Sequence, residues 1–78
     1  MAVTIPIAVE NKPKDILIEL RSLLDGRLIA EVYRGRCEPG LHNIEFDPLK
    51  IPGLEAGIYG LRIAIGDEAQ MYPIQFMP

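Results

Sequence analysis

The single cysteine, Cys37, is the first side chain to consider for chemistry. It lies in the segment "GRCEPG" beside Arg34 and Arg36, and neighbouring positive charge lowers the pKa of a thiol and makes it more reactive. The chain has no second cysteine that could resolve an oxidised intermediate. We therefore favour the alternative interpretation, a cysteine that packs at the end of a strand.

His42 is the only histidine in the sequence, so a histidine-pair metal site or a Ser–His–Asp relay would have to be built around it alone. It alternates with Ile44 and Phe46, and this spacing places all three on one face of a strand. The pattern favours a half-buried packing residue over a metal ligand or a catalytic base.

The remaining polar residues form no motif with a recognised chemistry. The calcium-loop spacing D-x-D-x-D-G is absent, and so are the G-x-G-x-x-G and P-loop patterns of nucleotide sites. Cross-strand pairs of Glu19 or Glu31 with Arg21 or Arg27 are the expected use of the carboxylates. The carboxylates considered are Asp15, Glu19, Glu31, Glu45, Asp47, Glu55, Asp67 and Glu68. The sequence thus predicts no catalytic residue, no metal and no cofactor, and a protein that is not an enzyme.

Length and charge narrow the function classes further. The 78 residues suffice for one domain, 1–78, with a composition typical of a folded protein. The net charge of −3 and the pI of about 5.0 argue against a nucleic-acid partner. The sequence has no signal-peptide pattern and no apolar run of about 18 residues, so no membrane insertion is expected. The compartment stays open.

Apolar residues recur at every second position in segment after segment, which is the period of a β-strand. Turn residues separate these segments, notably Asp25-Gly26 and the "EPG" that ends at Gly40. A helix over "ILIELRSLLDGRLI" is rejected because the Asp25-Gly26 turn interrupts it. The expected strands are "VTIPIAVE", "DILIELRS", "RLIAEVYRG", "LHNIEFD", "IYGLRIAIG" and "AQMYPIQFM".

These strands predict an all-β fold, a small antiparallel Ig/fibronectin III-like β-sandwich of about six to seven strands. Pro6 and Pro73 fall inside strand patterns, where a missing N–H is tolerated mainly at a sheet edge. The first and last strands are therefore expected at edges. Strict alternation then places four apolar side chains away from the core, where they are candidates for an interface with a partner. They are Leu17, Ile29, Tyr33 and Met71.

The stretches "ILIELRSLLDGRLIAEVYRGRCEPGLHNIEFDP" and "LEAGIYGLRI" together resemble a known type of module. They are similar to the Ig/fibronectin-like module of flagellar hook-capping proteins and to the C-terminal sorting domains of type IX secretion cargo. The likeness spans residues 14–66 and rests on turn and strand-start motifs. These are Asp25-Gly26-Arg27, Gly40, Phe46-Asp47 and Gly57-Ile58-Tyr59. The resemblance implies a β-sandwich and a cell-surface or particle-associated setting.

The last of these motifs carries a further expectation. Gly57 is expected to turn the chain at the end of a crossover loop, and Tyr59 to point toward the core with its hydroxyl on a nearby backbone group, as in a tyrosine corner. Gly26, Gly40, Gly57 and Tyr59 are thus predicted to serve the fold.

The function expected is a non-catalytic structural or interaction module. Such a subunit would dock into or stabilise a larger bacterial or phage assembly through a strand face or edge. A protein partner is expected, and self-association stays open. The alternative is a β-sandwich that binds carbohydrate or another small ligand. An exposed Tyr33 beside a groove would support this alternative. A third hypothesis is a redox sensor built on Cys37.

Overall fold

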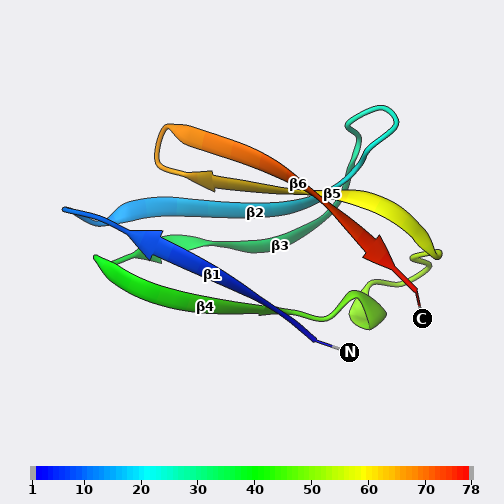
Figure 1. Cartoon of the computed structure of the whole chain (residues 1–78), viewed down its shortest axis with the longest axis horizontal. Coiled ribbons are helices and arrows are strands. Elements are labelled where there is room, and N and C mark those ends of the chain that lie inside the picture. The colour runs from blue at the N-terminus through cyan, green and yellow to red at the C-terminus, as the bar shows by residue number, and fades with distance from the viewer. Residues whose placement is uncertain (1, 78) are drawn as a thin grey trace.

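The chain folds into six antiparallel strands that form two facing sheets, a small β-sandwich (Figure 1). The structure is a computed structural model and describes residues 2–77. The predicted all-β class and the expected number of strands are confirmed. The strands are β1 (Val3–Val9), β2 (Lys14–Ser22), β3 (Leu28–Cys37), β4 (Gly40–Phe46), β5 (Gly57–Ile65) and β6 (Glu68–Phe76), and a 3-10 turn, η1, spans Pro48–Lys50.

The two sheets differ in size. The small sheet contains β1 and β4, and the large sheet has the order β3-β2-β5-β6. Hairpins join β2 to β3 and β5 to β6, while the chain crosses between sheets before β2, between β3 and β4, and between β4 and β5. β1 and β6 both lie at sheet edges, as their prolines predict.

The core lies between the two sheets. Alternate residues of β1 and β2 point inward, and Ile7, Ile16, Ile18 and Leu20 are the largest fully buried side chains. Removing such a side chain from water stabilises the fold by about 1.5–3 kcal/mol. The remaining buried members of the core are Ile5, Val9, Cys37, Phe46 and Leu61.

The β2–β3 hairpin turns at Gly26, whose φ of 74° lies in the region that glycine enters without steric cost. The Asp25 carboxylate accepts a hydrogen bond from the Arg27 backbone N–H at 2.9 Å. This backbone N–H holds the pKa of Asp25 below its ordinary value, because it stabilises the ionised carboxylate. Asp25-Gly26 thus sets the hairpin, as the sequence predicts.

Candidate interaction surfaces

Cys37 and His42 both make local structural contacts. Cys37 is the last residue of β3 and is buried in the core, with its Sγ 3.6 Å from the hydroxyl of Tyr33. That contact raises the pKa of Tyr33, because the hydrogen bond favours the neutral phenol. His42 is half-buried, and its Nε2 lies 2.6 Å from the carbonyl oxygen of Glu38 in the preceding turn. Each of these two side chains is thus engaged in a hydrogen-bond contact with a residue four positions away in the sequence.

Arg34 and Arg36, the cations beside the thiol in sequence, pair with carboxylates elsewhere on the sheet. Arg34 Nε lies 2.9 Å from Glu31, and Arg36 Nη1 lies 3.2 Å from Asp15. Residues 2–77 contain no group of three or more histidine, cysteine, aspartate or glutamate side chains that could hold a metal ion. In the same part of the chain, no helix has the length and apolar character needed to span a membrane.

Glu19 is a buried carboxylate, 6% exposed, on the outer face of the large sheet. Its Oε1 accepts hydrogen bonds from Arg21 Nε and Nη2 at 3.2 and 3.1 Å, and from Arg62 Nη1 of the neighbouring strand at 3.3 Å. Arg21 also donates to the carbonyl oxygen of Gly26 at 2.7 Å, so the cluster reaches the β2–β3 turn. The sequence predicts cross-strand pairs for Glu19, but the Glu19–Arg21 pair lies within β2. The cross-strand partner is Arg62, which lies 43 residues away in the sequence.

Two of the four interface candidates lie on this outer face. Leu17 is half-buried and pairs with Arg34 on one side and Ala64 on the other. Met71 is 43% exposed and pairs with Arg62. Glu19 and Arg62 form an ion pair in the same row of strand positions as Met71, and Leu17 belongs to the neighbouring row with Ala64.

The other two candidates, Ile29 and Tyr33, were expected on the outer face, and this expectation is wrong. Both are half-buried and pack against the core. Register shifts between β2 and β3 occur at Ile18/Glu19 and at Leu20/Arg21, and each bulge reverses the alternation of β3. Tyr33 consequently pairs with Ile18 and points inward. Its ring lies over Gly35, where an added Cβ would stand 2.8 Å from the hydroxyl oxygen.

The residues predicted to serve the fold occupy turns and strand starts. Gly26 lies in the β2–β3 turn, and Gly40 and Gly57 begin β4 and β5 with φ values of 135° and 159°. Tyr59 is half-buried against the core, and its hydroxyl donates to the carbonyl oxygen of Glu55 at 2.5 Å. This bond ties the crossover loop to the strand that follows it.

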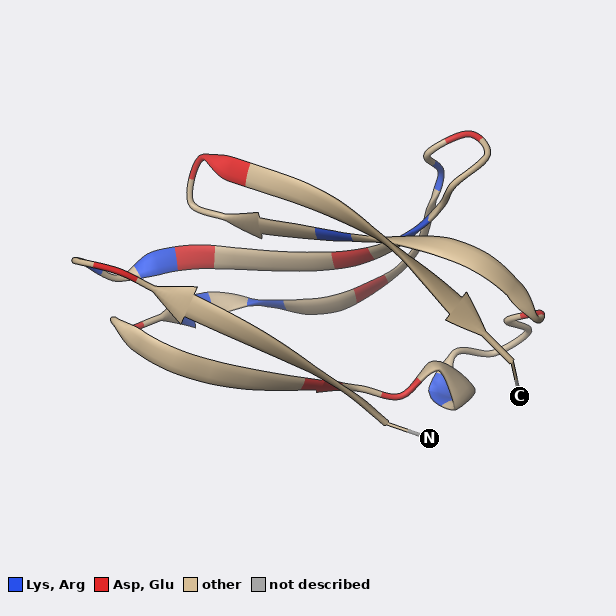
Figure 2. Cartoon of the chain, viewed as in Figure 1, with Lys and Arg blue, Asp and Glu red and all other residues tan. Residues whose placement is uncertain are grey.

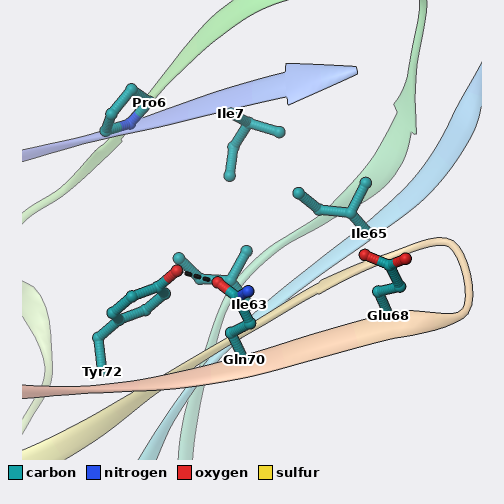
Figure 3. A pocket seen from close by; sticks show the side chains of 7 residues that line it. All are labelled: Pro6, Ile7, Ile63, Ile65, Glu68, Gln70 and Tyr72. Atoms are coloured by element: carbon teal, nitrogen blue, oxygen red, sulfur yellow. Dashed lines mark hydrogen bonds between the residues drawn. The ribbon is translucent and has the colours of Figure 1, made fainter. Parts of the chain in front are cut away.

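A groove between the free edges of β1 and β6 was not anticipated from the sequence (Figure 3). Its volume is about 150 Å³. In Figure 3, Tyr72, Gln70 and Glu68 point from β6 toward β1, and Ile7 points back toward them. The full lining is Pro6, Ile7, Ile63, Ile65, Glu68, Gln70 and Tyr72.

The groove exists because the small sheet covers only part of the large one. Tyr72, Gln70 and Glu68 occupy alternate positions of β6, in phase with the buried Phe76, and therefore share its inward face. All three are nevertheless exposed, and Tyr72 is 46% exposed. The Tyr72 hydroxyl donates to the Gln70 side-chain oxygen. We call the part of β6 that the small sheet leaves uncovered the open side of the sandwich. The alternation of glutamate, glutamine and tyrosine at its inward positions is the sequence signal that could have revealed it.

Glu68 is the charged residue among those that line the groove, and it lies at one end. Figure 2 shows acidic residues where β5 connects to β6: Asp67 lies in the turn and Glu68 is the first residue of β6. Within residues 2–77 the Glu68 carboxylate forms no ion pair. The groove thus combines isoleucine side chains, a tyrosine–glutamine hydrogen bond and an unpaired carboxylate.

Comparison of the chain with models of known families, with curated proteins and with solved structures finds no match.

Proposed function

We propose that this chain is a non-catalytic interaction module, an Ig/fibronectin-like sandwich that docks into a larger bacterial or phage assembly. The observation that supports the proposal most directly is the open side of the sandwich. The first six residues of β6, from Glu68 to Pro73, are exposed on both faces. A strand in a sandwich ordinarily buries one face, so an uncovered strand is a surface that a partner can complete.

The contacts of the reactive side chains also support a binding role over a chemical one. Cys37 is buried under Tyr33, and His42 is held by the Glu38 carbonyl. A redox sensor needs an accessible thiolate. Because Cys37 is buried, its position argues against the redox-sensor hypothesis. For the carbohydrate-binding alternative an exposed Tyr33 would have been the aromatic platform, but Tyr33 packs against the core.

The proposal is tested by measuring docking with matched surface variants. Purified wild-type chain, Tyr72→Glu, Leu17→Glu and the control Leu24→Glu are compared by affinity capture from extracts of the native source and by light scattering. Leu24 lies in the β2–β3 hairpin and is 98% exposed, so its substitution disturbs no packing. We expect a partner that Leu24→Glu retains and that Tyr72→Glu or Leu17→Glu loses. Monomeric chains that capture the same proteins in every variant would contradict the proposal.

A further inference from the structure

The free edge of β1 and the exposed inward face of β6 border the same groove. β1 pairs with β4 along one edge, from Val3↔Phe46 to Val9↔Gly40, and among the described residues no strand pairs with its other edge. Pro6 and Ile7 of this strand line the groove opposite β6. A strand added to β1 would extend the small sheet and lie over β6 (Figures 1 and 3).

We infer that this groove is the docking site for an extended segment of a partner protein. The segment adds a strand to β1 and carries a lysine or arginine that pairs with Glu68. The inference rests on the proposed function and names its site and the chemistry of its partner. Main-chain hydrogen bonds to a free strand edge supply affinity in this mode of recognition, and alternate side chains supply specificity.

The side chains that line the groove define what the segment must carry. Ile63 and Ile65 are half-buried at its base and call for apolar side chains at alternate positions. Covering Glu68 removes water from its carboxylate, which is costly without a partner of opposite charge. A lysine or arginine at the segment's end near the β5–β6 turn satisfies this requirement.

A second copy of this chain fits the groove less well. The chain has a net charge of −3, so two copies repel one another on average. The occupant with the better charge complementarity is a basic segment of another protein.

The inference is tested with a phage-displayed library of random linear peptides, selected on the full chain. Enriched peptides are expected to alternate apolar residues with polar ones and to contain lysine or arginine. Their binding should slow amide hydrogen exchange in β1 at the positions that β4 leaves free. Glu68→Lys should weaken the enriched peptides by about tenfold or more. The matched control Glu45→Lys, an exposed carboxylate of β4, should leave their affinity within about twofold.

Several results would overturn the inference. These are a library that yields no binder, enriched peptides without a basic residue, or peptides that bind without slowing exchange in β1. Dimerisation of the chain through β1 would also overturn it. If a captured natural partner is retained by Glu68→Lys and lost by Leu17→Glu, the strand-addition site is wrong while the proposed function stands. If no natural partner and no peptide binds, both fail.

Discussion

The hydroxyl of Tyr59 donates a hydrogen bond to the Glu55 carbonyl oxygen, and removing this hydroxyl tests how the crossover loop is held to β5. The variant Tyr59→Phe keeps the ring that packs against the core and deletes that bond. A net intramolecular hydrogen bond contributes about 0.5–1.5 kcal/mol, so we expect the free energy of unfolding to fall by about 1 kcal/mol.

Urea denaturation measures this loss. With a slope of about 1 kcal/mol per molar urea for a chain of this size, the midpoint should fall by about 1 M with the slope unchanged. The same loss corresponds to a decrease in melting temperature of about 4–8 °C. Partner binding should be unaffected, because Tyr59 lies outside the groove between β1 and β6.

Tyr72→Phe is the matched control. It removes a hydroxyl of the same chemistry whose partner is the exposed side chain of Gln70, and Tyr72 itself is 46% exposed. This variant should lose less than about 0.5 kcal/mol. Equal losses in Tyr59→Phe and Tyr72→Phe, or a Tyr59→Phe variant as stable as the wild type, would refute the role assigned to Tyr59.

The other predictions concern the core, the outer face and the β2–β3 turn. Ile18 is 0% exposed, so Ile18→Ala should lower the free energy of unfolding by about 2–5 kcal/mol through lost burial and a residual cavity, measured in urea. A loss below about 1 kcal/mol would show that Ile18 is not central to the core. Glu19→Ala should cost about 1.5–3 kcal/mol because it leaves two arginines without their shared acceptor, whereas Glu31→Ala, which breaks an exposed pair with Arg34, should cost less than about 1 kcal/mol. Equal costs would contradict the burial of Glu19. The lowered pKa of Asp25 means that its stabilising contribution is present at neutral pH and is lost as the pH falls below the ordinary value of 3.8. The stability difference between wild type and Asp25→Asn should therefore shrink in acid titrations, and a difference that does not change with pH would count against the bond to Arg27.

Much of the fold follows from local sequence patterns. The inward faces of β1 and β2 were predictable because isoleucine, valine and leucine alternate there without interruption. The β2–β3 turn was predictable because Asp25-Gly26 is a strong hairpin signal by itself. Such elements need no knowledge of distant residues.

The inward positions of Ile29 and Tyr33 could not be predicted from local sequence patterns in the same way. Their orientation depends on two bulges, and a bulge is a property of how β2 pairs with β3 rather than of either strand alone. The same limit applies to Glu19, whose partner Arg62 comes from β5. Cross-strand register, fixed only in the folded chain, decides both features.

The groove was missed for a related reason. The alternation correctly groups Tyr72 with Ile74 and Phe76 on one face of the last strand. Whether that face is covered depends on how many strands the opposite sheet contains, and the small sheet ends at β1. The exposure of Tyr72 is thus a consequence of topology.

Amide hydrogen exchange of the chain, free and bound to its natural partner, tests the central claim most directly. Strand addition predicts that the β1 amides not bonded to β4 exchange more slowly in the complex, and that Glu68→Lys reduces this protection at a partner concentration that half-saturates the wild type. Protection confined to β3 or to the outer face around Leu17, with β1 unchanged, would contradict it.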